Sequence, residues 1–127
     1  MAEKEKFQLE FVVNASPKLL FNFLATPSGL SDWFADNVNS RGEQFPFMWD
    51  GSEETATLLT KKAGSHVKFK WDDDEDEDSF FEIRMQIDDL TGDLSLIITD
   101  FAEEDEMDEA ILLWESQINK LKTVIGG

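Results

Sequence analysis

The stretch 107–125 constrains the fold more than any other part of the chain. Its apolar residues recur at steps of four and three, which places them on one face of an α-helix. At 1.5 Å per residue this helix is about 30 Å long, enough to cross a small domain. Acidic residues at its start and lysines near its end suit the helix dipole, and Gly126 ends it. The predicted buried face consists of Met107, Ile111, Trp114, Ile118, Leu121 and Ile125.

Much of the chain before this helix alternates between apolar and polar residues, which is typical of half-buried β-strands. Short turns separate these segments, so an antiparallel meander is expected rather than parallel crossovers. Pro46 predicts an edge position or a bulge for its strand, since proline cannot donate to the ladder. The predicted strands are 7–13, 36–40, 44–49, 55–60, 66–71, 81–87 and a last one from 94.

Two short helices are predicted between the first and second strands. Ser16 and Thr26 are good N-cap residues, and each is followed by a proline that suits the first helical position. Leu30, Trp33 and Phe34 have the spacing of one face of the second helix. The predicted order is therefore strand, two helices, six strands and helix, an α+β fold in which a sheet wraps around one long helix.

Length and composition limit the class of protein. A chain of 127 residues is expected to form a single domain, 1–127, with residues 1–6 frayed. The absence of cysteine excludes disulfides, thiolate metal sites and cysteine nucleophiles. The N-terminus lacks the apolar core of a secretory signal, and no apolar run is long enough to span a membrane. We therefore expect a cytoplasmic protein.

The net charge of -17 is large for this length. Such a surface repels nucleic acid and anionic membranes and attracts basic partners, although a simple solvated surface is the more ordinary interpretation. The run 72–78 consists entirely of acids, so it is predicted to form an exposed hairpin tip between two strands.

No catalytic or metal-binding pattern stands out. His66 is the one histidine, it shares the outward register of Lys68 and Lys70, and Ser65 beside it should point to the opposite face. Zinc would need more histidine or cysteine ligands, and neither 72–78 nor 100–111 has EF-hand spacing. We expect a non-enzymatic protein with no metal and no cofactor. A buried carboxylate with a raised pKa beside a pocket would favour an enzyme instead.

Four motifs taken together resemble the START-like (SRPBCC) superfamily, and most of all the branch related to the activator of the ninety-kilodalton heat-shock protein ATPase. The motifs are S-P-x-x-L-F from Ser16, T-P-x-x-L-x-x-W-F from Thr26, W-D-G from Trp49, and a C-terminal helix that contains Trp114. The resemblance implies a helix-grip fold, in which a curved antiparallel seven-stranded sheet grips the C-terminal helix around a cavity. Members commonly hold lipids, sterols or polyketides there; others are enzymes or bind proteins.

Inward-facing aromatic residues indicate either a packed core or the wall of such a cavity. The favoured hypothesis is binding of a small hydrophobic ligand, lipid-like or polycyclic, with Trp33 and Phe34 as a gate and Asn37 or Gln117 as a polar anchor. The alternative is a protein-interaction module, such as a chaperone partner, that uses the acidic surface; a monomer or weak homodimer is expected. The predicted cavity lining is Phe11, Trp33, Phe34, Phe47, Trp49, Phe69, Trp71, Phe81, Ile83, Met85, Trp114, Ile118 and Leu121.

Overall fold

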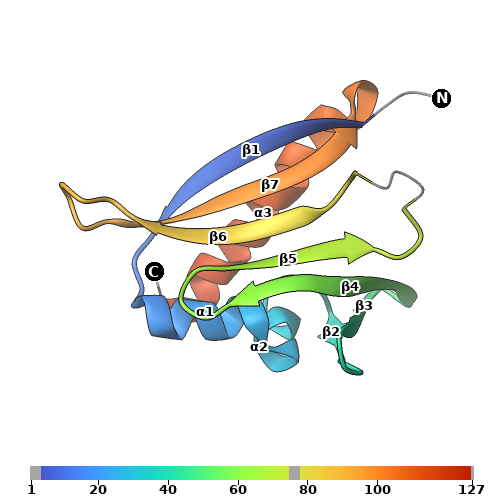
Figure 1. Cartoon of the computed structure of the whole chain (residues 1–127), viewed down its shortest axis with the longest axis horizontal. Helices are drawn as coiled ribbons and strands as arrows, with labels where there is room; N and C mark the ends of the chain where they lie inside the picture. The colour runs from blue at the N-terminus through green and yellow to red at the C-terminus, as the bar shows by residue number, and fades with distance from the viewer. Residues whose placement is uncertain (1–3, 75–77, 127) are drawn as a thin grey trace.

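The computed structural model, which describes residues 4–74 and 78–126, contains one seven-stranded antiparallel sheet with the strand order β1-β7-β6-β5-β4-β3-β2. Figure 1 shows the curved sheet in front and the long helix α3 crossing behind it. Helices α1 and α2 lie below β4 in this view. The strands are β1 (Lys4–Val13), β2 (Asn37–Val38), β3 (Gln44–Trp49), β4 (Ser52–Lys62), β5 (His66–Trp71), β6 (Phe81–Ile87) and β7 (Leu94–Glu103). The helices are α1 (Pro17–Ala25), α2 (Pro27–Ser31), the single 3₁₀ turn η1 (Glu104–Glu106) and α3 (Met107–Ile125).

Strands β2 to β7 follow one another as neighbours in the sheet, which confirms the predicted antiparallel meander. The first strand then pairs with the last one: β1 runs antiparallel to β7 from Lys4 opposite Glu103 to Val13 opposite Leu94. This pairing places the start of the chain beside the strand that leads into α3. The predicted α+β order and the grip of a curved sheet on one helix are confirmed.

Helix α3 has the predicted bounds and buries the predicted face. Trp114, Ile118 and Leu121 are buried against the sheet, and the other apolar residues of that face are partly buried. The helix ends at Gly126, whose φ of 77° is the left-handed conformation that glycine adopts without steric cost. We call the sheet surface that faces α3 the inner face.

The two short helices begin as their caps predict. Ser16 Oγ accepts a hydrogen bond from the Leu19 N–H, and Thr26 Oγ1 accepts one from the Gly29 N–H. Helix α2 ends at Ser31, however, so Trp33 and Phe34 lie in the turn after it and not on its face. They are still buried because tertiary contacts replace the helical ones; the Trp33 indole donates to the Phe23 carbonyl at 2.8 Å.

Some strand boundaries differ from the sequence predictions. β2 has two residues instead of the predicted five. Asp36 and Asn39, on either side of it, each donate one backbone hydrogen bond to β3 but are not part of the strand. Pro46 lies in β3, the second strand from the edge of the sheet, and β3 has no bulge there. The chain beside Pro46 is Asn39, just beyond the end of β2, and the Asn39 N–H donates to the Pro46 carbonyl. The sheet therefore needs no backbone N–H from Pro46 at this position. Strand β4 extends beyond 55–60 at both ends, to Ser52–Lys62.

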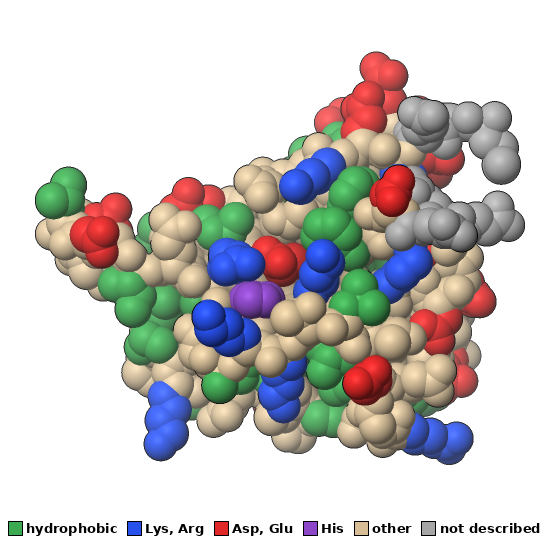
Figure 2. Space-filling model, viewed as in Figure 1, with side chains coloured by type: hydrophobic (Ala, Val, Ile, Leu, Met, Phe, Trp, Pro, Cys, Tyr) green, Lys and Arg blue, Asp and Glu red, His purple; other side chains and the backbone are tan. Residues whose placement is uncertain are grey.

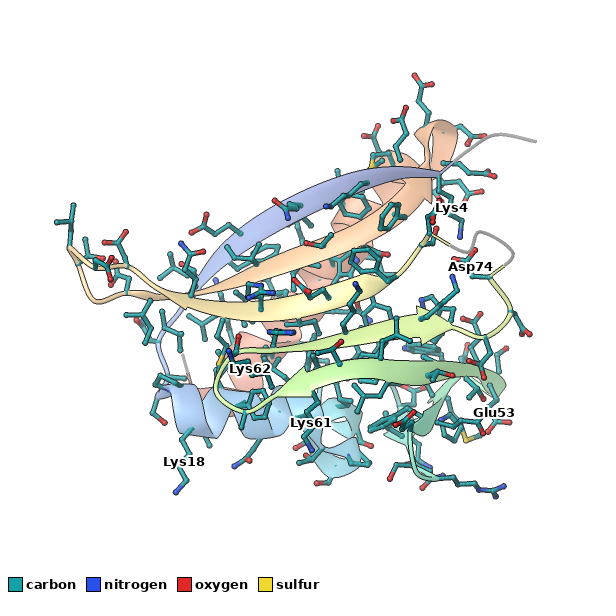
Figure 3. All side chains as sticks on the ribbon, in the orientation of Figure 1. Lys4, Lys18, Glu53, Lys61, Lys62 and Asp74 are labelled. Carbon is teal, nitrogen blue, oxygen red and sulfur yellow. The ribbon has the colours of Figure 1, made fainter. Side chains whose placement is uncertain are left out.

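Two predictions about exposed segments need correction. Residues 4–6 are not frayed, since β1 begins at Lys4; residues 1–3 lie outside the described residues. The acidic run is exposed at Asp72, Asp73 and Asp78, but the Asp74 side chain is 9% exposed and forms an ion pair with Lys4 at 2.9 Å (Figure 3). The opposite charge on β1 holds the start of the run against the sheet. Residues 75–77 lie outside the described residues.

The outer face of the sheet carries the polar registers. His66 lies opposite Arg84, and Lys68 lies opposite Glu82. Figure 2 shows this face, with lysine and arginine side chains around the histidine. Basic side chains therefore gather on the face of the sheet that points away from α3.

We expect Gly29→Ala to destabilise the protein, because α2 packs closely on α1 at this glycine. An added Cβ would meet the Asn22 carbonyl oxygen and lie 2.7 Å from the Phe23 Cα, which are backbone atoms that cannot move freely. The free energy of unfolding from urea titration should fall by about 1–3 kcal/mol. Ser28→Ala, at an exposed position of the same helix, is the control and should change it by less than about 0.5 kcal/mol. Equal stabilities of the two variants would contradict the close packing.

Candidate functional site

An aromatic cavity of about 430 Å³ lies between the inner face of the sheet and α3. Five strands contribute to it, from β3 to β7, together with α3 and the turn after α2. The cavity is lined by Phe34, Trp49, Glu54, Trp71, Phe81, Asp100, Leu113, Trp114 and Gln117.

Strand ends explain why aromatic side chains meet at this place. Trp49 is the last residue of β3, Trp71 is the last residue of β5, and Phe81 is the first residue of β6. Because neighbouring strands are antiparallel, these three positions fall at the same end of the sheet. Phe34 and Trp114 reach them from the turn after α2 and from α3.

The five rings form one packed cluster. Neighbouring centroids are 5.7 Å apart for Phe34 and Trp49, 5.8 Å for Trp49 and Trp71, 5.2 Å for Trp71 and Phe81, 6.1 Å for Phe81 and Trp114, and 5.6 Å for Trp114 and Phe34. Phe34 and Phe81 are stacked at 5.6 Å, and the other pairs are tilted by 32° to 63°. We call this wall of the cavity the aromatic bowl. Phe34, Phe81 and Trp114 are buried, whereas Trp49 and Trp71 are partly exposed at the rim.

Asp100 brings a carboxylate into this aromatic wall. Its Oδ2 accepts the Trp114 indole N–H at 2.8 Å, and its Oδ1 accepts the Phe101 backbone N–H at 2.7 Å. Burial raises the pKa of Asp100 above its ordinary value; the two hydrogen bonds and the charge of Lys4 lower it, and the charge of Asp74 raises it. Burial dominates, so this carboxylate is held at an energetic cost.

The Phe34 carbonyl fixes two further lining residues. The Trp49 indole N–H and the Gln117 side-chain N–H each donate to it at 2.9 Å. These bonds tie β3 and α3 to the turn that follows α2. They also orient Gln117, since its nitrogen must face the carbonyl and its amide oxygen is left for other partners.

The predicted lining residues divide into a wall and a core. Five line the cavity: Phe34, Trp49, Trp71, Phe81 and Trp114. The others do not line it and pack in the hydrophobic core beneath it: Phe11, Trp33, Phe47, Phe69, Ile83, Met85, Ile118 and Leu121. Of the two suggested polar anchors, Gln117 lines the cavity, whereas Asn37 is exposed in β2 and does not.

Sequence reasoning missed Glu54, Asp100 and Leu113, although a signal existed for the two acids. Asp100 lies two residues after Ile98 on β7, and Glu54 lies two residues before Ala56 on β4. Both Ile98 and Ala56 are fully buried, so the period of two places the acids on the inner face as well. An acidic residue at an inward-facing position of a strand could therefore have predicted a polar group in the site.

His66 lies on the outer face, away from this cavity. One detail of the sequence argument is wrong, because Ser65 Oγ and His66 Nδ1 are 2.9 Å apart. Ser65 belongs to the turn before β5, where strand alternation does not apply. The cross-strand partner of His66 is Arg84 and not the acid that a Ser-His-acid relay needs.

Three carboxylates at the junction of β7 and α3 approach one another. Oxygen atoms of Glu103, Asp105 and Glu106 lie within 4.8 Å, and two of these residues are exposed. Acids at a helix start are favoured by the helix dipole without any ion, so we assign no metal to them. A second cavity of about 540 Å³ beside β2 and β3 is lined mainly by polar residues such as Asn39, Arg41 and Gln44, and it does not suit an apolar ligand.

Comparison with known proteins identifies the family. The model of the START-like superfamily domain matches residues 1–127. The chain belongs to this superfamily. A protein from Bacteroides fragilis, BfR322, is 42% identical over 98% of this chain and 92% of its own, with a TM-score of 0.67 for its solution structure. No curated protein matches the chain.

More distant solved structures share the fold alone. The Aha1 dimer from Colwellia psychrerythraea is 15% identical, with a TM-score of 0.81 and coverage of 95% of this chain and 96% of that one. This neighbour agrees with the resemblance to the branch of heat-shock protein ATPase activators. A conserved protein of unknown function from Enterococcus faecalis, EF2215, is 19% identical with a TM-score of 0.73, and the match covers 96% of this START-like chain and 71% of that one. Of the helices within residues 4–74 and 78–126, none is long and apolar enough to cross a bilayer.

We expect Trp114→Phe to raise the pKa of Asp100 further, because it removes the indole N–H that stabilises the carboxylate. A group whose pKa is raised in the folded state destabilises the fold as pH rises through that pKa. The variant should therefore lose about 1–3 kcal/mol of unfolding free energy at neutral pH, and less at acid pH where Asp100 is protonated. Carboxyl ¹³C NMR titration and urea unfolding at both pH values measure these effects.

Trp49→Phe is the matched control for this experiment. It also removes one indole N–H, but that donor serves the Phe34 carbonyl and not Asp100. The pKa of Asp100 should stay unchanged in the control. The same Asp100 pKa in the wild type and in Trp114→Phe would disprove the stabilising role of the Trp114 bond.

Proposed function

We propose that this START-like protein binds a small hydrophobic molecule in the aromatic cavity. The observation that carries the proposal is the cluster of five contacting aromatic rings that lines a cavity of about 430 Å³. Ligand sites are typically concave, mainly apolar and roughly 300–1,000 Å³ in volume, with a few fixed polar groups. Asp100, Glu54 and Gln117 are the polar groups here.

The size of the cavity limits the ligand. Its volume suits a compact ring system or one short chain better than a lipid with two long chains. Contact with the rings would supply the affinity, at about 25 cal/mol for each Å² of apolar surface removed from water. The hydrogen bonds that hold Trp49, Trp114 and Gln117 reduce the entropy lost when the ligand binds, because these side chains are already oriented.

The proposal is binding without chemical conversion. Asp100 has the raised pKa that acid-base catalysis uses, and it is the observation that an enzyme hypothesis would rest on. Its two oxygen atoms are each fixed by an N–H donor, and the remaining lining groups are rings, a leucine, an amide and one further carboxylate. This arrangement can recognise a ligand by shape and charge, whereas catalysis would also need a group that activates a nucleophile or stabilises a developing charge.

Protein interaction is the second candidate function. Leu112 and Leu113 are 64% and 60% exposed on α3, and large apolar side chains on a surface favour contact with another protein. Aha1 from Colwellia psychrerythraea, whose fold is similar, is a dimer in its solution structure. In this alternative the acidic surface would steer a basic partner, so association would weaken with salt. Sedimentation tests self-association through these leucines: two copies of a chain with net charge -17 repel each other, so salt should strengthen a dimer, and Leu112→Ser should weaken it.

A neutral fluorescent hydrophobe, N-phenyl-1-naphthylamine, should bind with saturation and emit more strongly in the cavity. Leu113→Ala should weaken this binding about three- to tenfold, since part of a buried apolar contact worth about 1 kcal/mol is lost. Leu113 is well exposed, so its truncation leaves the fold intact. Fluorescence titration of wild type and variant gives the two dissociation constants.

Leu112→Ala is the control, because Leu112 is the next residue on the helix and equally exposed but does not line the cavity. Its affinity for the dye should match that of the wild type. Equal weakening in both leucine variants would indicate binding to the helix surface, and the absence of saturable binding would refute the proposed function.

A further inference from the structure

The aromatic bowl offers a surface that attracts positive charge. The face of an aromatic ring is the negative side of its quadrupole, and a cation within about 6 Å of several ring centroids is attracted by all of them. Three of the five rings are tryptophans, which give the strongest attraction of this kind. A cation placed over the bowl would meet Trp49 and Trp71 at the rim and Trp114 deeper in the wall.

The polar atoms of the cavity are mainly acceptors. The N–H groups of Trp49 and Trp114 and one N–H of Gln117 are directed at protein acceptors. The carboxylates of Asp100 and Glu54 and the amide oxygen of Gln117 keep lone pairs for a ligand. Among the residues that the structure describes, no lysine or arginine lines this cavity. An anionic ligand would therefore face two carboxylates, with the nearest positive charge, that of Lys4, in the neighbouring cavity and paired with Asp74.

A cavity next to the aromatic one is also acidic. It has a volume of about 230 Å³, shares Glu54 and Trp71 with the aromatic cavity, and its other lining residues are Lys4, Thr55, Asp73 and Asp74. Lys4 forms an ion pair with Asp74 at 2.9 Å, so Glu54 and Asp73 contribute the net negative charge there. The acidic run thus begins beside the aromatic bowl, where it would concentrate cations.

We propose that the ligand of the aromatic cavity is an organic cation, an alkylated ammonium attached to an apolar group, with its charge between the aromatic bowl and the carboxylates of Asp100 and Glu54. This inference rests on the proposed function and adds the charge of the ligand. The carboxylates among the rings would then balance the charge of the ligand. The cations of the outer face do not reach this cavity, where both ionisable lining residues are acids.

The test compares two probes of the same shape, benzyltrimethylammonium and its neutral carbon isostere neopentylbenzene. The indole ¹H–¹⁵N signals of the four tryptophans report where each probe binds. Trp49, Trp71 and Trp114 line the cavity, whereas Trp33 is buried elsewhere and serves as an internal control. The ammonium should shift the first three signals and bind about tenfold more tightly than the isostere.

Charge-neutral variants then assign the preference to particular carboxylates. Asp100→Asn should reduce ammonium affinity about tenfold and leave the neutral probe within about twofold. Glu54→Gln should have a smaller effect in the same direction, because the charge of an exposed carboxylate is screened by water. The exposure of Glu54 also means that this substitution leaves the fold intact. Asp89→Asn, in the distant turn between β6 and β7, removes the same charge and should change neither affinity.

A pH series adds a readout that a structural defect would not imitate. Ammonium affinity should increase as pH rises through the pKa of Asp100, because the ionised carboxylate is the partner. The groups that face Asp100 are the Trp114 indole, the Phe101 N–H, Lys4 and Asp74, with Glu54 in the same cavity wall. The increase should disappear in Asp100→Asn, and the neutral probe should show none.

The outcomes separate the two proposals. Equal or tighter binding of the neutral isostere, with shifts of the three cavity tryptophans, would overturn the cation inference and support the hydrophobic cavity. No saturable shift with either probe would overturn both. An ammonium preference that persists in both Asp100→Asn and Glu54→Gln would also overturn the inference, because the charge would then be recognised elsewhere.

Discussion

The whole structure depends on burying one apolar helix face against a curved sheet. α3 carries its buried residues at helical spacing, and the strands present theirs at a period of two, so both elements need a partner for their apolar sides. Ile118 and Leu121 are fully buried in this contact. A single helix cannot cover every strand of a seven-stranded sheet. The aromatic cavity lies at the Trp114 end of this contact, where Trp114 is buried against Phe81 and lines the cavity as well.

The cavity is stabilised by polar contacts that reach across elements far apart in the sequence. The Phe34 carbonyl accepts from both Trp49 and Gln117, and Asp100 accepts from Trp114. These bonds orient the rings at the positions where they contact one another. Burial raises the pKa of Asp100, so keeping its carboxylate ionised in this wall opposes the stability of the fold.

The fold was largely predictable because its determinants are local. The Ser16 and Thr26 caps, the alternation of 66–71 and the spacing along α3 each depend on neighbours within a few residues. The candidate site was predictable only in part. Trp71 and Phe69 have the same inward register, yet Trp71 lines the cavity and Phe69 is fully buried in the core. Trp71 is the last residue of β5 and is partly exposed, whereas Phe69 lies inside the strand, and the alternation alone does not distinguish the two positions.

The sequence by itself determined the order of elements, the inward and outward registers, the buried face of α3 and the family motifs, because backbone geometry imposes periods that side chains must follow. Tertiary structure alone decided which aromatic residues form a wall and which form a core. It also decided that Asp100 and Glu54 reach that wall, and that Asp74 pairs with Lys4 across 70 residues. These outcomes depend on the curvature of the sheet and on the line along which α3 crosses it, which are set by the packing of all the elements together.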